Sequence, residues 1–208
     1  MVRRTNCFEA RPGSKYIAFY KPYAVLCQFS QPPDSNKRSL AEFGFPKNVY
    51  PIGRLDYDSE GLLLLSDDKR MNQALLNPDN AHERFYLAQI ENIPTAAALA
   101  KLARGVLIEG SVTAQAKVNL LEKEPELPPR AIPIRVRKNI PTAWIQLTLK
   151  EGRNRQVRKM TAAIGHPTLR LIRIAIGSLG LLDLDLAPGQ WRALSESEMN
   201  LAFERGKG

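Results

Sequence analysis

A group of charged residues with catalytic potential lies directly before a short apolar run. The carboxylates belong to Asp56, Asp58 and Glu60, and Arg54 precedes them. The run at residues 62–65 is four leucines, too short for a membrane span and suited to a strand buried on both faces. Such carboxylates can be an ordinary solvated turn, because charged loop residues are usually exposed. Placed in a loop beside a buried strand, they could equally carry chemistry.

Four motifs decide between these interpretations. Residues 53–56 read Gly-Arg-Leu-Asp, and residues 59–65 read Ser-Glu-Gly followed by the four leucines. Together they resemble the catalytic motif of RNA pseudouridine synthases of the RsuA branch. The segment 151–160 resembles the second signature of that branch, and Lys21-Pro22 and Arg84-Phe85-Tyr86 resemble two further motifs in the expected order. The matches span about residues 15 to 192, and the chain is most similar to members without an N-terminal RNA-binding domain.

The resemblance implies a reaction and its catalytic residues. Asp56 would be the essential carboxylate in the isomerisation of uridine to pseudouridine, acting on the sugar, on the base or by assisting elimination. Arg153 matches the conserved arginine of the family and would keep Asp56 ionised and oriented. Tyr86 matches the tyrosine that stacks on the target base and removes its C5 proton, although tyrosine is a weak base at its ordinary pKa. Arg84 departs from the family's lysine and keeps the charge.

The charge of the chain points to a polyanion. The formal net charge is +9 at pH 7, and residues 130–173 contain eleven basic residues against one acidic residue, Glu151. A stretch of one sign costs self-repulsion unless an anion lies against it. We expect the RNA contacts to come from Arg54, Lys21, Arg155, Arg158, Lys159, Arg135 and Arg137.

Three of these expectations have a more specific basis. A helix after residue 154, capped by Asn154, would bury Val157, Met160 and Ile164 and present the basic side chains on its other face. Arg54 is placed to fill the space that a flipped uridine leaves in the RNA. Lys21 either lines the cleft, as the resemblance implies, or is a surface lysine at the end of a strand.

We predict an α+β fold with a mixed, largely antiparallel central sheet, surrounding helices and two lobes flanking a catalytic cleft. This architecture follows mostly from the resemblance, and the order of strands with scattered helices agrees with it. Residues 1–14 are predicted to be a flexible basic tail, and residues 15–208 the catalytic domain.

No metal or cofactor is expected, because two cysteines and two isolated histidines give no usual ligand spacing. The chain contains no apolar window of transmembrane length and no signal peptide, so we expect a cytoplasmic protein that does not contact membranes. The expected partner is ribosomal RNA, specifically the 23S RNA of the large subunit, bound by a monomer.

Two other functions remain possible from the residues alone. A non-catalytic RNA-binding or ribosome-assembly protein would explain the charge, but a polyanion binder gains nothing from Asp56. A nucleoside or glycoside hydrolase could use Asp56 with Asp58 or Glu60 as a carboxylate pair.

Overall fold

The computed structural model describes residues 8–31, 35–134 and 139–204. Its main sheet has nine strands, mostly antiparallel, and the exception on its central path is the parallel pair β5–β11. The path runs in the order β13 (Trp191–Ala193), β1 (Tyr16–Lys21), β5 (Glu60–Ser66), β11 (Thr168–Ile176), β6 (Arg84–Glu91), β10 (Thr142–Leu149) and β9 (Lys117–Leu120). β12 (Leu179–Gly180) pairs with β11, and β4 (Tyr50–Pro51) pairs with β5.

Smaller elements surround this sheet. The α-helices are α1 (Lys69–Leu76), α2 (Ala96–Arg104), α3 (Gln156–Ala163) and α4 (Glu196–Leu201). The 3-10 turns are η1 (Leu40–Phe43), η2 (Pro78–Asn80) and η3 (Leu182–Leu184). Two short pairs complete the structure: β2 (Val25–Leu26) with β3 (Arg38–Ser39), and β7 (Leu107–Ile108) with β8 (Ser111–Val112).

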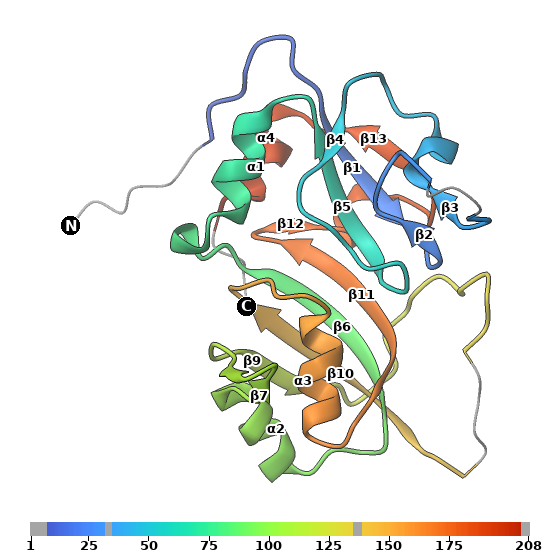
Figure 1. Cartoon of the computed structure of the whole chain (residues 1–208), viewed down its shortest axis with the longest axis vertical. Helices are drawn as coiled ribbons and strands as arrows, with labels where there is room; N and C mark the ends of the chain where they lie inside the picture. The colour runs from blue at the N-terminus through green and yellow to red at the C-terminus, as the bar shows by residue number, and fades with distance from the viewer. Residues whose placement is uncertain (1–7, 32–34, 135–138, 205–208) are drawn as a thin grey trace.

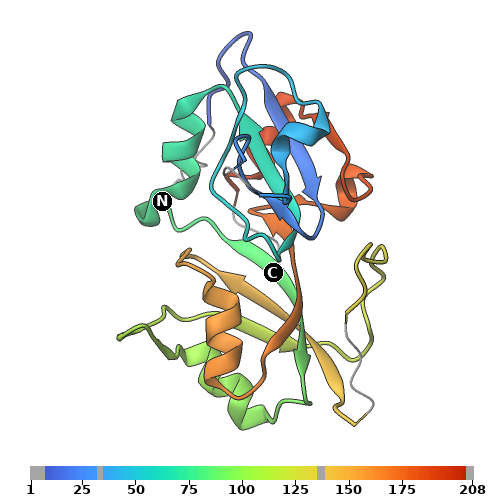
Figure 2. The same cartoon turned by 45° about the vertical axis from the view of Figure 1, so that its right-hand side comes forward.

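The sheet is divided into two halves that meet at β11. In Figure 1, β1, β5 and β13 form the upper half with α1 and α4, and β6, β10 and β9 form the lower half with α2 and α3. The view in Figure 2 shows α2 and α3 lying over the same face of the lower strands. The predicted fold class, a mixed and largely antiparallel sheet with few helices, is confirmed.

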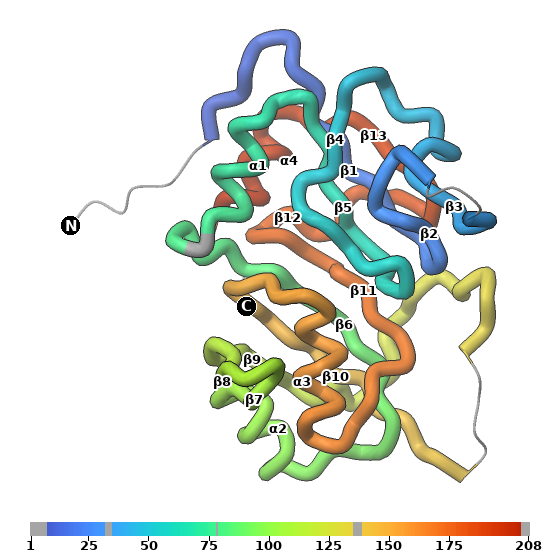
Figure 3. The backbone as a smooth tube through the Cα atoms, in the orientation of Figure 1, coloured from blue at the N-terminus to red at the C-terminus, as the bar shows by residue number. Residues whose placement is uncertain are grey.

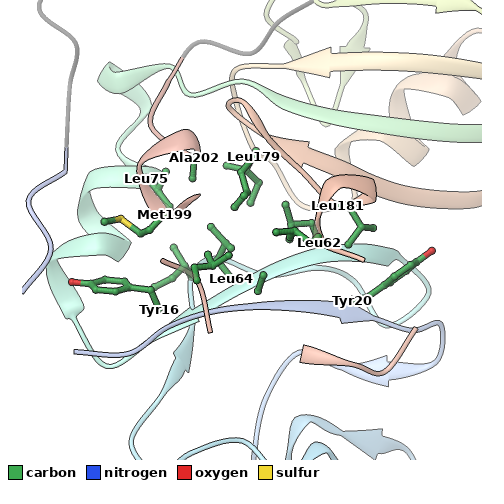
Figure 4. Close-up of a cluster of buried hydrophobic side chains, with 14 of the residues drawn as sticks. Tyr16, Tyr20, Leu62, Leu64, Leu75, Leu179, Leu181, Met199 and Ala202 are labelled. Atoms are coloured by element: carbon green, nitrogen blue, oxygen red, sulfur yellow. The ribbon is translucent and has the colours of Figure 1, made fainter. Parts of the chain in front are cut away.

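The upper half has a hydrophobic core on each face of β5. Leu62 and Leu64 belong to one core, and Leu63 and Leu65 belong to the other. Figure 4 shows the first core, where side chains of β1 and β5 meet those of α1 and α4. All four leucines are fully buried, which confirms the prediction of a strand covered on both faces. The loop that carries Asp56 therefore leads directly into a strand that is buried on both faces.

In the lower half, one face of the sheet forms a core with the helices. Ala88, Ile145 and Leu147 of the strands pack against Leu102 of α2 and Met160 of α3. Because α3 packs against this core, its N-terminus has a fixed position relative to the lower strands.

The packed body begins before residue 15. The Phe8 ring stacks on Phe203, with ring centroids 4.8 Å apart, and the Arg11 N–H donates to the Tyr16 hydroxyl over 2.9 Å. Of the predicted flexible tail, Phe8 and Arg11 thus contact the folded body, and residues 1–7 lie outside the described residues.

Candidate active site

The loop at residues 52–59 connects β4 to β5 and carries Asp56. Its turn is closed by the Ser59 N–H, which donates to the Asp56 carbonyl over 3.1 Å. The Ala24 N–H donates to the Tyr57 carbonyl over 2.9 Å, and the Lys21 Nζ donates to the Ser59 carbonyl over 2.8 Å. The backbone that follows Asp56 is therefore tied to the end of β1 and the turn after it.

The Lys21 side chain lies under this loop and is shielded from the solvent. Its side chain is 0 % exposed, and its Nζ also donates to the Pro22 carbonyl over 3.1 Å. Burial lowers the pKa of Lys21 to about 8. A direct contact between Lys21 and RNA, predicted from the sequence, is wrong for this conformation because the side chain is covered. Lys21 instead holds the loop in place.

Two arginines of the α3 region form hydrogen bonds with Asp58 from the opposite side of the pocket. The Arg155 guanidinium is bidentate, with Nη1 2.8 Å from Oδ1 and Nη2 2.7 Å from Oδ2 of Asp58. The Arg158 Nη2 donates to the Asp58 carbonyl over 2.6 Å, and its Nη1 donates to the Thr168 carbonyl over 3.0 Å. Burial tends to raise the pKa of Asp58, but the Arg155 hydrogen bonds and both positive charges outweigh it, so the pKa is lowered. These contacts join the two halves of the protein across the site.

Arg155 is also the arginine that reaches Asp56. Its Nη1 lies 4.0 Å from the Asp56 Oδ2, and among the described residues no other basic nitrogen lies within that distance of this carboxylate. Arg155 precedes α3 with a left-handed backbone, φ 51° and ψ 33°, and no side chain caps the helix. The predicted cap by Asn154 is wrong, because the Asn154 Oδ1 accepts from the Lys159 Nζ over 3.0 Å instead.

Arg153 lines the same pocket but has other partners. Its Nη1 donates to the Ser111 Oγ over 2.7 Å, its Nη2 donates to the Val112 carbonyl over 2.8 Å, and its Nε lies 3.3 Å from the Glu151 carboxylate. Figure 3 shows the β7–β8 pair, which Arg153 contacts, beside α3. The predicted pairing of Arg153 with Asp56 is absent from this arrangement, and Arg155 takes that place.

The opposite wall is formed by strands of the main sheet. Tyr86 of β6 is half-buried and lines the pocket, as do Arg84 of the same strand and Arg173 of β11. The Arg84 Nη2 donates to the Leu75 carbonyl over 3.0 Å, and burial lowers the pKa of Arg84. Arg173 is buried and stands directly opposite Tyr86 in the register of β11 and β6.

The two walls enclose one pocket of about 830 Å³. Asp56 and Arg54 line it from the loop, Tyr86 and Arg173 line it from the strands, and Arg155 lines it from the start of α3. This volume lies within the range of about 300–1,000 Å³ that is usual for small-molecule sites. A carboxylate, a tyrosine ring and several cations thus converge on one space large enough for a nucleotide.

Glu60 and Asp58 do not provide a second catalytic carboxylate. Glu60 is 2 % exposed and is held by Arg170, whose Nε and Nη2 each lie 2.9 Å from one of its oxygens. The carboxylate of Asp58 is engaged by Arg155 and Arg158. Neither carboxylate is free to work with Asp56, which argues against the hydrolase interpretation.

The remaining basic residues are distributed unevenly around the site. Arg54 is exposed on the pocket wall, as an RNA contact requires. The Lys159 Nζ pairs with Glu109 over 2.6 Å, and Arg158 is largely covered by its contacts with Asp58. Arg135 and Arg137 lie outside the described residues. RNA contacts by Arg54, Arg155, Arg158 and Lys159 stay predictions.

Sequence reasoning missed the positions of two side chains. Asp58 was considered as a second carboxylate, but its role as the link to α3 depends on contacts 97 and 100 residues away in the chain. Arg173 was counted only as one of many positive charges. A signal was present, since Arg173 stands in the otherwise apolar run Leu-Ile-Arg-Ile-Ala-Ile, where a buried charge needs a reason.

Similarity to known proteins agrees with the motifs. The model of the family described as RNA pseudouridylate synthase matches residues 15–163. "Ribosomal large subunit pseudouridine synthase E" of Xanthomonas campestris pv. campestris is 51 % identical over 176 residues, covering 85 % of this chain and 93 % of that protein. The protein of the same name from Vibrio vulnificus is 44 % identical over 199 residues, covering 93 % of this chain and 83 % of that protein.

A solved structure described as "Crystal structure of pseudouridylate synthase" superposes with a TM-score of 0.74 at 27 % identity. The alignment covers 91 % of this chain and 74 % of that one. None of the helices in the described residues has the length and apolar character that crossing a membrane requires.

Proposed function

The chain belongs to the RNA pseudouridine synthase family, and from that premise we propose that it isomerises a uridine of large-subunit ribosomal RNA, with Asp56 as the essential carboxylate. The single observation that carries the assignment of Asp56 is its position, facing Tyr86 across one pocket, within 4.0 Å of Arg155. The large-subunit substrate is supported by the names of the two relatives.

The reaction moves one bond and one proton within the nucleotide. The bond between the sugar C1′ and the base N1 breaks, and a bond between C1′ and the base C5 forms. The proton on C5 is lost to a base and N1 gains a proton, so that the product is an isomer of the substrate. An ionised Asp56 at the sugar would assist departure of the base, either by attacking C1′ or by accepting a proton during elimination.

Arg155 suits the role of holding Asp56 ionised and oriented. Its guanidinium is held by the bidentate pair with Asp58, and this pair keeps the Arg155 Nη1 beside Asp56. We therefore assign to Arg155 the role that the family resemblance implied for Arg153. Tyr86, on the opposite wall, is placed to stack on the base and to accept the C5 proton.

The test compares two aspartates that are two residues apart. Asp56→Asn should reduce single-turnover formation of pseudouridine by at least about 10³-fold, because it removes the reactive charge at nearly constant volume. Asp58→Asn is the comparison, since it leaves Asp56 ionised but loosens the bidentate contact that orients Arg155, and it should slow the reaction by no more than the loss of Arg155 itself, about 10²-fold. An Asp56→Asn protein that still works at a tenth of the wild-type rate would remove Asp56 from the essential role.

The substrate is tested in cells. Deleting the gene and mapping pseudouridines across all stable RNAs should reveal one missing site in large-subunit ribosomal RNA. Loss of a site in transfer RNA, with every ribosomal site retained, would contradict the proposed substrate.

We also propose that residues 15–208 act as one catalytic domain, in the cytoplasm and as a monomer. Ribosomal RNA as substrate supports the cytoplasmic location, and a pocket built from both halves of a single chain supports the monomer. Sedimentation of the protein at working concentration checks the latter.

A further inference from the structure

Arg173 is a buried cation on the pocket wall with unused hydrogen-bonding capacity. It is 4 % exposed, and its Nε donates to the Leu62 carbonyl over 2.8 Å. Its Nη2 is buried and has no hydrogen-bond partner among the described residues. Because buried donors without partners are rare in native proteins, this one requires an explanation. The pocket that Arg173 lines offers one, since a bound ligand could accept the missing hydrogen bond.

The backbone around Arg173 is fixed by close strand packing. Gly61 of β5 pairs with Arg173, and a Cβ at position 61 would lie within 2.3 Å of the Arg173 carbonyl. A register shift between Arg173 and Ala175 interrupts the pairing of β11 with β6. Such bulges redirect side chains next to active sites. The guanidinium is therefore held at one place beside Tyr86.

The charge of Arg173 is not balanced by the protein. Among the described residues, no carboxylate lies within 4.0 Å of its guanidinium, whereas Arg170 on the same strand is paired with Glu60 at 2.9 Å. Its charged neighbour in the pocket is another cation, Arg84, whose pKa is lowered first by burial and further by Arg173. Desolvated cations without a counter-ion are costly, so this wall is suited to a partner that carries negative charge.

The proposed reaction creates negative charge at this place. When the bond between C1′ and N1 breaks, its electron pair leaves with the uracil ring. The resulting charge is delocalised over N1 and the two carbonyl oxygens until C5 forms its bond to C1′. Prearranged donors aimed at charge that develops during a reaction are a major source of catalysis. Tyr86, opposite Arg173 on the neighbouring strand, would hold the plane of the ring.

We propose that the Arg173 guanidinium donates a hydrogen bond to a carbonyl oxygen of the target uracil and stabilises the negative charge of the detached ring. This inference rests on the proposed function. Arg173 is then a catalytic residue whose free donor is completed by the substrate. The same contact would keep the ring in the pocket while it turns from N1 to C5.

The test varies the acidity of the base. 5-Fluorouracil is a more acidic base than uracil, and its ring therefore leaves more easily and needs less help from a cation. Single-turnover cleavage of the C1′–N1 bond is measured on two stem-loop RNAs that carry uridine or 5-fluorouridine at the target position. Arg173→Gln should slow the uridine substrate by about 10²–10³-fold. The 5-fluorouridine substrate should be slowed at least about tenfold less.

Arg54→Gln is the matched control. It removes an exposed arginine from the same pocket, and its penalty should be equal for the two substrates because it does not contact the ring. Equal penalties for Arg173→Gln would overturn the proposal. A weaker RNA affinity, with the double-logarithmic salt slope reduced by about one, would also overturn it, since Arg173 would then bind a phosphate.

Folding is checked by thermal unfolding of each variant, because the Arg173 Nε also supports the Leu62 carbonyl. Should Arg173→Gln fail to fold, Arg173→Lys makes the same comparison, keeping a cation but losing the planar fork. Its penalty should again be larger for uridine, and equal penalties would again overturn the proposal. If the wild-type protein forms no pseudouridine, the proposed function fails. If it does so and the penalties are equal, only the role of Arg173 fails.

Discussion

On the loop wall of the pocket, the carboxylates of Asp56 and Asp58 face the guanidinium of Arg155. On the strand wall, Arg84 and Arg173 have no carboxylate within 4.0 Å among the described residues. The first wall thus balances its charges within the protein, and the second leaves its positive charges unbalanced.

This difference separates charges that maintain the structure from charges that await a substrate. The contacts of Asp58 connect a loop of the upper half to α3 of the lower half, so they fix the geometry of the pocket before RNA binds. The cations of the strand wall are desolvated in advance, which makes them stronger partners for an incoming negative charge. The predictions below alter one wall, or its support, at a time.

Breaking the buried ion pair between Glu60 and Arg170, on the strands behind the pocket, should have the largest effect. Glu60→Gln leaves the buried Arg170 charge without its partner, and removing one member of a buried pair costs about 3–5 kcal/mol. We expect denaturant unfolding to report a loss of this size. The surface pair of Arg38 with Glu42 is the control, and Glu42→Gln should cost much less stability because exposed ion pairs are screened by water. Equal losses for the two pairs would mean that burial does not distinguish them.

Lys21 supports the loop wall at the expense of stability at neutral pH. Its pKa is lowered by burial to about 8, so the unfolded chain binds more protons between about pH 8 and its usual pKa near 10.4. The free energy of unfolding should therefore rise with pH in this window, and burying the charged lysine should cost up to about 3 kcal/mol below it. Unfolding of wild type and Lys21→Met at about pH 7.5 and about pH 9.5 measures this rise. If the free energy of unfolding of Lys21→Met rises with pH as much as that of the wild type, the rise comes from other groups.

Substitutions of Arg155 and Arg153 should have different effects. Arg155 lies beside the proposed catalytic carboxylate of Asp56, whereas Arg153 contacts the β7–β8 pair at the edge of the pocket. Arg155→Ala should reduce turnover by about 10²-fold with RNA affinity within about threefold, because Asp56 loses its neighbouring charge. Arg153→Ala should reduce turnover by less than about tenfold, since its partners are Ser111, Val112 and Glu151. Single-turnover rates beside equilibrium binding provide both numbers. The opposite order of effects would restore Arg153 as the partner of Asp56.

Arg54 should show the smallest effect, confined to binding. As an exposed cation, it would release about one counterion when it contacts a phosphate. Arg54→Ala should lower the slope of log affinity against log salt by about one unit and weaken all RNAs alike. A salt titration with the target stem-loop and an unrelated stem-loop measures both. An unchanged salt slope would mean that Arg54 does not bind a phosphate, and its predicted role would then be to fill the space that the flipped uridine leaves.

Much of the fold could be predicted because its signals are local. Asp68 accepts from the Arg70 N–H and caps α1, and Thr95 accepts from the Ala98 N–H and caps α2, as the residue types indicate. The start of α3 could not be predicted in the same way. There a left-handed Arg155, held by a carboxylate of the other half, replaces the usual cap.

The sequence by itself determined the family, the position of the candidate aspartate in its motif and the apolar strand after it, because these depend on residue types at fixed spacing. Only the tertiary structure decided which arginine meets Asp56, why Lys21 is covered and where Arg173 points. Those outcomes depend on the approach of β5 to α3 and β11, from which β5 is separated by about a hundred residues of chain. The sequence shows which charged side chains the protein has. Packing decides which of them form ion pairs within the protein and which are left without a counter-ion in the pocket.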